Sequence, residues 1–504
     1  MHQNVTALAR FLSLASLAAV VVTGACKSSS DEPPADAGAD VDMRPPTPPE
    51  WDRPVTRPSD SDAVTGRGSC KFGAGSMPAE TLGTSVPVDK DIPIDTVVVV
   101  MMENRSFDHY FAHLNKFAKR TDIESAPDNA TNPSMTGATP GVSVPFTHAP
   151  HMCTLDTNHE WAGTHVQWDD GKMDGFVETN EAWDAVKLPP TSDPALAKGD
   201  RAMYYYDERD IPFYYNLANT FAIADHYHAS LLGPTWPNRM YLLAGTSFGL
   251  TFNGFPDISL YLFPDKDSSV LDELEKRHVS WNLFGDGVPG AGVIYNVGFL
   301  SRWGHPAKLP FADFLSEAAG GTLPQVSILD PHIGAEGPDQ NDEHPPADIQ
   351  VGQKFMSDVV HALMKSPKWA HTALFITWDE HGGFYDHVAP PLACAPDALP
   401  PQLEPGDTTV GNFDRLGVRV PFILVSPYAK PGYVGHGVYD HSSIARFIQT
   451  KFKLPALSAR DANADPLMDL FDFSSPKLLT PPNLAEPTVD QAELAYCKKT
   501  YAKP

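Results

Sequence analysis

The sequence predicts an α/β protein with a central, mostly parallel β-sheet sandwiched by helices. Two observations predict it: short apolar, β-branched runs alternate with segments of helical periodicity, and long Pro/Gly-rich loops separate them. In this class of protein, the loops at the carboxyl ends of the strands bind ligands. We therefore expect the functional residues directly after the strands.

Three runs are the clearest strands. They are apolar without alternation, which is typical of strands buried on both faces: Thr96–Met102, Ala373–Trp378 and Pro421–Ser426. Helices are expected where apolar residues recur every three or four positions, at Ser268–Arg277, Ile349–Met364 and Ser442–Lys451. No repeat and no second polar linker interrupts this pattern, so we expect one catalytic domain over residues 72–504.

The first 26 residues predict an export signal. Arg10 precedes the apolar run Phe11–Val22, which is too short for a stable membrane span, and small residues then lead to Cys26. This ending resembles the cleavage and acylation site of bacterial lipoproteins, although Thr23 stands where that pattern prefers Leu. An ordinary secretory signal is the alternative. Residues 27–62 are rich in Pro, Ser, Asp and Ala and predict a disordered tether. The protein is expected in the cell envelope, periplasmic or at the surface, or secreted.

The composition excludes several classes of function. The chain of 504 residues has a formal net charge of −26, which repels phosphate backbones and anionic membranes. We therefore expect no nucleic-acid partner, and membrane contact only through the N-terminal lipid anchor. The hydrophobic content of 42% indicates a packed globular domain and excludes disorder of the whole chain.

The cysteines agree with export. Apart from Cys26 there are four, an even number that suits two disulfides in an oxidising compartment: Cys70, Cys153, Cys394 and Cys497. Three pairings can be drawn from four cysteines. We favour Cys70 with Cys497, which would join the two ends of the domain, and Cys153 with Cys394. Buried free thiols are the alternative.

Two strand ends carry oxygen-bearing side chains. Glu103 and Asn104 follow the first strand, and a carboxylate beside a carboxamide can form part of a divalent metal site. The alternative is that Asn104 or Ser106 caps a helix that starts near Phe107. The second strand ends in a run of three carboxylates and two imidazoles within nine residues: Asp379, Glu380, His381, Asp386 and His387. A bound cation would compensate the repulsion among these carboxylates.

A third segment, GPTWPNRMY, predicts a loop that turns into a helix with Thr235 at the N-cap and Pro237 in the first turn. A hydroxyl there feels the positive end of the helix, which favours an alkoxide or a bound phosphate. Arg239 is a candidate to pair with phosphate oxygens. The alternative is an ordinary Thr cap. Several histidines in loops are candidates for metal ligation or general acid chemistry: His148, His151, His159, His165 and His344.

Six segments in this order resemble the bacterial phosphoesterase family of phosphatidylcholine-type phospholipases C and related acid phosphatases, in the alkaline phosphatase superfamily: ENRSFDHYF, GPTWPNRMYLLAG, NDEHPPADIQVGQKF, ITWDEHGGFYDHVAPP, GVRVPFILVSPYA and YDHSSIARFI. The resemblance spans Asp95 to Phe452. It implies an alkaline-phosphatase-like fold, with a central sheet between helices and the active site at the carboxyl ends of the strands.

The resemblance also implies roles for single residues. It makes Thr235 the nucleophile, which forms a phospho-threonine intermediate, and it implies a divalent metal ion held by Glu103, Asn104, Thr235, Asp379 and Glu380. His159 and His344 match histidines that line the phosphate pocket, one of them as general acid. We further predict that Arg239, His381 and His387 bind substrate. The metal stays open among Ca²⁺, Mg²⁺, Mn²⁺, Fe and Zn²⁺.

The substrate is predicted to be a phosphate ester, most specifically a phospholipid headgroup diester. The preference for a diester is implied by the resemblance, because the phospholipase branch of that family has Thr at the nucleophile position and the acid phosphatase branch has Ser. The larger phospholipases have C-terminal β-domains for which this sequence has no room, which weighs against lipid specificity. Nominees for an aromatic choline cage are Trp161, Trp168 and Tyr204 to Tyr206. The alternatives are an acid phosphatase-type phosphomonoesterase and a non-catalytic metal- or ligand-binding surface lipoprotein.

Overall fold

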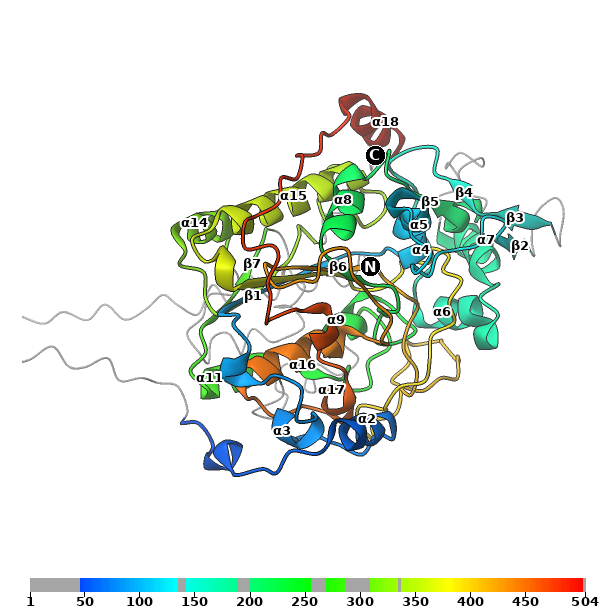
Figure 1. Cartoon of the computed structure of the whole chain (residues 1–504). Coiled ribbons are helices and arrows are strands. Elements are labelled where there is room, and N and C mark those ends of the chain that lie inside the picture. The colour runs from blue at the N-terminus through cyan, green and yellow to red at the C-terminus, as the bar shows by residue number, and fades with distance from the viewer. Residues whose placement is uncertain are drawn as a thin grey trace, which may run out of the picture. The chain divides into compact units, whose positions relative to one another are not determined.

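The computed structural model of the chain describes residues 46–134, 142–187, 199–254, 269–286, 309–333 and 337–501 (Figure 1). The predicted export signal, residues 1–26, and the first part of the predicted tether lie outside these ranges. In the part of the chain that is described, no helix is long and apolar enough to cross a membrane.

A seven-stranded mixed sheet forms the centre of the molecule, with the strand order β11-β6-β10-β9-β1-β8-β7. Its strands are β1 (Thr96–Met102), β6 (Ala222–Ala224), β7 (Trp281–Phe284), β8 (Val326–Leu329), β9 (Thr372–Trp378), β10 (Phe422–Val425) and β11 (Val434–Gly435). Neighbouring strands are parallel except at β10, which is antiparallel to both β9 and β6. The prediction of a mostly parallel sheet is confirmed.

The register of the two central strands aligns their carboxyl ends. β1 pairs with β9 along its whole length, from Thr96 opposite Thr372 to Met102 opposite Trp378. Every residue of both strands is buried, because helices cover both faces of the sheet. The residues that follow Met102 and Trp378 therefore emerge side by side.

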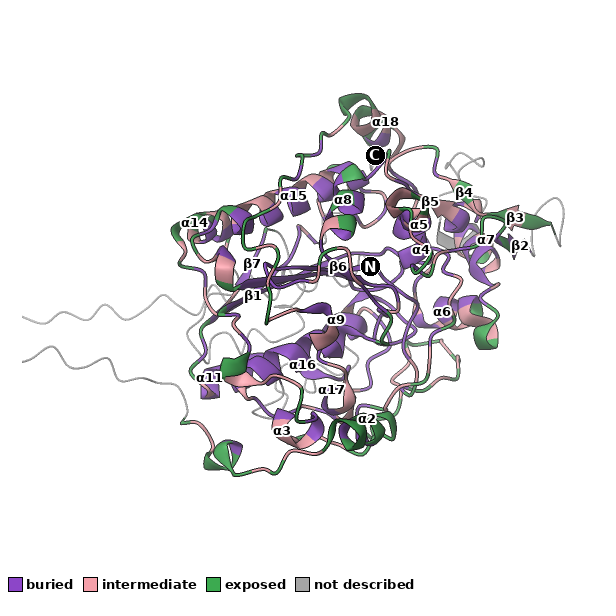
Figure 2. Cartoon of the chain, viewed as in Figure 1, coloured by how far each residue is buried: buried purple, intermediate pink, exposed green. Residues whose placement is uncertain are grey.

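The helices form two layers (Figure 1). On one face of the sheet lie α8 (Pro212–Thr220), α14 (Phe311–Gly320) and α15 (Ile349–Lys365), and on the other lie α9 (Thr235–Ala244), α11 (Val270–Lys276) and α16 (His441–Phe452). In the first layer, α8, α14 and α15 have exposed or half-buried residues on their outer sides, whereas α11 and α16 are buried throughout (Figure 2). The helices predicted at Ile349–Met364 and Ser442–Lys451 match α15 and α16, and the helix predicted at Ser268–Arg277 is α11, capped by Ser269.

The remaining helices surround this core. They are α2 (Asp60–Gly68), α3 (Pro78–Thr81), α4 (Phe107–Phe111), α5 (Leu114–Ala118), α6 (Trp161–Trp168), α7 (Phe176–Lys187), α17 (Ala459–Asn463) and α18 (Gln491–Tyr501). Two small sheets pair β2 (Thr131–Pro133) with β3 (Ser143–Pro145), and β4 (Thr147–His148) with β5 (Tyr204–Tyr205).

Part of the segment predicted as a tether is folded. A short 3₁₀ helix, η1 (Pro49–Asp52), buries Trp51 in the main hydrophobic core, and Asp52 pairs with Arg277 and Lys453. Ser59 then caps α2. A single aromatic anchor in a Pro-rich sequence is therefore enough to attach these residues to the domain.

Two disulfides are present, Cys70–Cys394 and Cys153–Cys497, with Cα–Cα distances of 5.4 and 6.0 Å. The predicted pairing was wrong. Cys70 follows α2, which lies against the long loop after β9, and Cys497 is on α18, which lies against the loop before α6. Each end of the domain is thus linked by a disulfide to an internal loop, and only the tertiary fold shows which loop that is.

Candidate active site

The turns after β1 and β9 are joined by backbone hydrogen bonds. The Asn104 and Glu380 amides both donate to Asp379 Oδ1, at 3.1 and 2.8 Å, and the Arg105 amide donates to the Glu380 carbonyl at 3.0 Å. Asn104 adopts a positive φ of 63°. Gly382 also has a positive φ, and any Cβ there would collide with the Asn104 carbonyl. These contacts bring Glu103, Asn104, Asp379 and Glu380 together.

This cluster concentrates negative charge away from water. Glu103, Asp379 and Glu380 are all buried. Burial, helped by the Asp379 and Asp330 carboxylates and opposed by Arg239, raises the pKa of Glu103 to about 8. Burial, followed by the charge of Asp379, also raises the pKa of Glu380 well above its ordinary value. The cluster therefore holds more carboxylates than its own protein partners compensate.

Two buried oxygens indicate where a positive charge would compensate these carboxylates. Asn104 Oδ1 and Glu380 Oε1 have no hydrogen-bond partner among the described residues. A buried acceptor without a partner costs on the order of 1–3 kcal/mol, and more when it is charged. Carboxylate and amide oxygens are the ligands that hard or borderline divalent cations prefer. The donor set at the ends of β1 and β9 thus fits a divalent metal ion.

The loop before α9 is shaped by Asn238. Its side-chain oxygen accepts from the amides of Ser230 and Leu231, and its side-chain nitrogen donates to the carbonyls of Gly233 and Pro234. Pro234, and not Thr235 as predicted, occupies the N-cap position, and Thr235 is the first helical residue. The prediction was wrong by one residue, because Pro at the cap lacks a side-chain acceptor and gives no sequence signal for a helix start.

Arg239 connects α9 to the strand ends. Its Nε donates to Asp379 Oδ2 at 3.1 Å, and its Nη2 lies 3.5 Å from Glu103 Oε1. A further ion pair joins it to Asp330 at 3.4 Å. Thr235 lies one turn before Arg239 on the same face of α9, the face from which Arg239 contacts the carboxylate cluster. The guanidinium predicted to bind phosphate is thus occupied by carboxylates, and its contact with substrate stays a prediction.

His159 and His344 lie next to each other beside the carboxylate cluster. Their ring centroids are 5.7 Å apart, and His159 Nε2 is 3.3 Å from Asn104 Nδ2. Each Nδ1 donates to a backbone carbonyl, of Thr157 at 2.7 Å and of Pro345 at 2.6 Å, which orients the rings. With Nδ1 as the donor, His159 Nε2 accepts from Asn104 Nδ2, and His344 Nε2 is left for a ligand or a proton.

Asp156 completes this group and was not predicted. Its carboxylate and the two rings offer ligand atoms within 4.8 Å of one another, a spacing that can hold a metal ion. Burial opposes the charged rings, but Glu380 and Asp156 raise the pKa of His159, and Asp156 and Asp342 raise that of His344. The Asp-x-x-His spacing of Asp156 and His159 is the sequence signal that could have identified this residue.

His381 and His387 have other partners. The Nε2 of His381 lies 2.6 Å from Gln167 Oε1, and its Nδ1 lies 3.3 Å from Glu380 Oε2. Burial, followed by the charge of His159, lowers the pKa of His381 to about 3, so this ring is neutral and orients Glu380. His387 bonds to Asp108 at 2.6 Å and to Glu124 at 3.0 Å. Both rings therefore have partners within the protein. Their predicted contacts with substrate stay predictions.

The Asp108–His387 pair predicts a pH-dependent stability. Burial opposes the charged ring, but Asp108 and Asp386 raise the pKa of His387 to about 9. A raised pKa stabilises the fold fully below the unfolded value near 6.5, and the effect is lost as the pH rises through 9. We expect His387→Gln to lower the free energy of unfolding by about 2 kcal/mol at pH 6, and by much less at pH 9.5. Urea unfolding at both pH values measures this, and an equal loss at both would contradict it.

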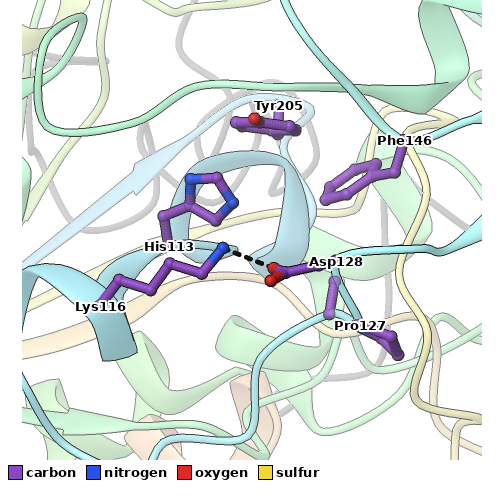
Figure 3. Close-up of a pocket in the computed structure, with 7 residues that line it drawn as sticks. His113, Lys116, Pro127, Asp128, Phe146 and Tyr205 are labelled. Atoms are coloured by element: carbon purple, nitrogen blue, oxygen red, sulfur yellow. Dashed lines mark hydrogen bonds and ion pairs between the residues drawn. The ribbon is translucent and has the colours of Figure 1, made fainter.

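One hollow in the described part of the molecule is lined by none of the cluster residues. It has a volume of about 200 Å³ and is lined by Phe146 and Tyr205, with Lys116 paired to Asp128 at its rim (Figure 3). Of the residues predicted for a choline cage, only Tyr205 lines it. Trp161 is packed against His165, and Trp168 is covered by the Arg415 guanidinium. The described residues therefore form no aromatic cage around the cluster.

The phosphoesterase family model matches residues 94–455 of this chain, from β1 to the residues that follow α16. The chain belongs to the phosphoesterase family. This confirms the resemblance carried by the six motifs and makes the protein a hydrolase of phosphate esters. The segment that contains α18 lies beyond the matched residues.

Two curated relatives of this phosphoesterase cover most of it. Phospholipase C A of Mycobacterium tuberculosis is 32% identical over 444 residues, which cover 78% of this chain and 80% of the relative. Non-specific phospholipase C1 of Arabidopsis thaliana is 32% identical over 415 residues, which cover 78% of this chain and 74% of the relative.

Among solved structures, the phosphoesterase is similar to the lipoteichoic acid synthase LtaP from Listeria monocytogenes, with a TM-score of 0.37 and 8% identity over 76% of this chain and 79% of that one. It is also similar to a protein in the alkaline phosphatase superfamily from Vibrio parahaemolyticus, with a TM-score of 0.32 and 10% identity over 71% and 77% of the two chains. Neither likeness supports a statement about function at these scores.

Proposed function

We propose that this phosphoesterase is an exported, metal-dependent enzyme that hydrolyses phospholipid headgroup diesters, with Thr235 as nucleophile. The observation that carries the proposal is the contact of Arg239 on α9 with Asp379 and Glu103 at the joined ends of β1 and β9, because Thr235 lies one turn earlier on the same face of this helix. The relatives named phospholipase C support the substrate class.

The metal would be held by the oxygens of Glu103, Asn104, Asp379, Glu380 and Thr235. The uncompensated oxygens of Asn104 and Glu380 support this assignment. When bound, such a cation lowers the pKa of a coordinated hydroxyl and neutralises charge on the phosphoryl oxygens.

The chain's own residues supply the remaining steps. The Thr235 hydroxyl gives its proton to solvent and its oxygen attacks phosphorus in line, the bond from phosphorus to the leaving alcohol breaks, and a phospho-threonine that still carries the headgroup forms. His159 or His344 donates a proton to the leaving oxygen, for which their raised pKa values suit them. The same histidine then takes a proton from the water that cleaves the phospho-threonine. The positive end of the α9 helix dipole stabilises negative charge on the phosphoryl group.

Two disulfides support export, because such bonds persist in oxidising compartments. Within this proposal Cys26 carries a lipid anchor, and the mature enzyme works in the cell envelope.

The substrate assignment predicts a preference for diesters. The purified protein is stripped of metal, reconstituted with single ions (Ca²⁺, Mg²⁺, Mn²⁺, Fe²⁺ and Zn²⁺) and assayed with nitrophenyl phosphocholine and nitrophenyl phosphate. We expect kcat/KM for the diester to exceed that for the monoester by at least about tenfold with the best ion, a difference of about 1.4 kcal/mol in transition-state binding. The reverse preference would assign the protein to the phosphomonoesterases.

A further inference from the structure

The C-terminal helix α18 contacts both segments that carry the candidate histidines. We call residues 150–159, which end at His159, the first histidine loop, and residues 337–350, which contain His344, the second. The helix lies at the edge of the molecule, beside the layer formed by α8 and α15 (Figure 1). It lies outside the residues matched by the family model, which end at 455.

The first histidine loop is held by a covalent bond and a ring contact. Cys497 of α18 forms a disulfide with Cys153, six residues before His159. On the preceding turn of the helix, Glu493 lies 3.2 Å from His151 Nδ1, and the Tyr496 ring stacks on the His151 ring with centroids 3.8 Å apart. Both sulfur-bearing residues are buried.

The second histidine loop is held by polar contacts with the same helix. Lys498 Nζ lies 3.0 Å from Asp339 Oδ2, and the Asp490 amide, directly before α18, donates to Gln350 Oε1 at 2.9 Å. The two loops also meet directly, because the Ile349 amide donates to the Met152 carbonyl at 3.0 Å. Exposed ion pairs contribute at most about 1 kcal/mol, so the disulfide is the strongest of these links.

Close packing does not replace the disulfide. A cavity of about 70 Å³ lies between α18 and the first histidine loop, lined by Thr154 and Leu155 on the loop side and by Tyr496 and Tyr501 on the helix side. The loop's other contacts are hydrogen bonds: Arg201 Nε donates to the Asp156 carbonyl at 3.0 Å, and the Tyr206 hydroxyl donates to the His151 carbonyl at 3.0 Å. The Cys153–Cys497 bond is thus the covalent link that holds this loop to α18.

We propose that α18 and its disulfide position His159 and His344 for proton transfer to the leaving group. This inference rests on the acid role assigned to one of these histidines in the proposed function. A general acid contributes about 10² to 10⁴ in rate, and misplacement by about 1 Å can remove a large part of that. Cys153, Cys497, Glu493 and Tyr496 are thus positioning residues, because none of them touches the carboxylate cluster.

The test compares two leaving groups in the full-length protein. In Cys153→Ser/Cys497→Ser we expect kcat to fall at least about tenfold for a phosphocholine ester of a simple alkyl alcohol, which needs protonation as it leaves, and less than about threefold for the nitrophenyl ester, which does not. KM is expected to stay unchanged. A merely structural role would lower both rates equally.

The second disulfide provides a matched control. Cys70–Cys394 closes a loop of 324 residues and Cys153–Cys497 one of 344, so chain entropy makes their contributions to stability nearly equal. Cys70→Ser/Cys394→Ser should therefore lower Tm by a similar amount without a leaving-group effect. If the Cys153/Cys497 variant is too unstable to assay, Glu493→Ala/Tyr496→Ala keeps both disulfides and is expected to show the same selectivity at about threefold.

His159→Ala and His344→Ala separate the two hypotheses. At least one should show the strong dependence on the leaving group. If one histidine variant shows this dependence and neither variant at α18 (Cys153→Ser/Cys497→Ser or Glu493→Ala/Tyr496→Ala) shows it, the positioning role is overturned and the proposed function stands. If neither histidine variant shows it, the acid role is overturned, and the positioning role with it. An equal fall in kcat for the alkyl ester in Cys153→Ser/Cys497→Ser and in Cys70→Ser/Cys394→Ser would also overturn the positioning role.

Discussion

Thr235→Ala is expected to lower kcat by at least about 1,000-fold while the protein remains folded. The reason is that the hydroxyl would be the atom that bonds to phosphorus, and no neighbouring group at the start of α9 replaces it. Thr235 is the first helical residue, and the cap position belongs to Pro234. Loss of the hydroxyl should therefore cost little helix stability. Steady-state rates on the diester, with Tm from calorimetry, measure both parts.

Two variants and one direct observation sharpen this test. Thr235→Ser keeps a hydroxyl and is expected to retain at least about a tenth of the activity. Thr246→Ala removes a buried hydroxyl just beyond the other end of α9, one that bonds to Asp397, and should leave kcat unchanged. Acid quenching during turnover of the phosphocholine diester, followed by mass spectrometry, should find phosphocholine on Thr235. Thr235→Ala with more than about a thousandth of wild-type activity would count against the nucleophilic role.

Metal removal is expected to lower kcat by more than about 100-fold and to lower Tm as well. The stability effect follows from the cluster at the ends of β1 and β9, where Glu103 and Asp379 share Arg239 and the Glu380 carboxylate is buried beside them. Glu380→Gln removes one buried charge. We expect the metal-free form of this variant to be at least as stable as the metal-free wild type, and the rise in Tm on adding metal to shrink to less than about half.

Glu343→Gln is the matched control for Glu380→Gln. Glu343 is a buried carboxylate too, but it accepts hydrogen bonds from Tyr110, Tyr214 and Trp378 and contributes none of the proposed ligands. Its replacement is expected to cost stability through those bonds, yet the rise in Tm on adding metal should match that of the wild type. A Glu380→Gln protein with an unchanged metal-induced shift in Tm would remove Glu380 from the metal site.

The strands and the place of the site could be predicted from the sequence alone. The run Thr96–Met102 is a strand with the predicted bounds, and Ala373–Trp378 starts only one residue late. A strand buried on both faces is apolar at every position, so an unbroken apolar run in the sequence marks where the strand begins and ends. Parallel strands end at one edge of the sheet, and the structure brings the polar residues that follow β1 and β9 together there, while their role as the active site stays a prediction.

Pairings between distant residues could not be predicted. The sequence left three disulfide pairings open, and the favoured one was wrong because the ends of the domain each lie against a loop from its middle. Likewise, the positive charge of Arg239 predicted an anionic partner, but the same charge fits a phosphate or a carboxylate. Only the fold, which places Arg239 opposite Asp379, reveals its partner.

The sequence by itself thus determined the α/β class, the strand ends and the types of side chain available for chemistry. The tertiary structure decided which of them meet: Asp156 with His159 and His344, His387 with Asp108, and α18 with both histidine loops. The physical reason is that hydrophobic periodicity depends on neighbours in sequence, whereas Coulomb and hydrogen-bond energies depend on distances in space between residues that lie far apart along the chain.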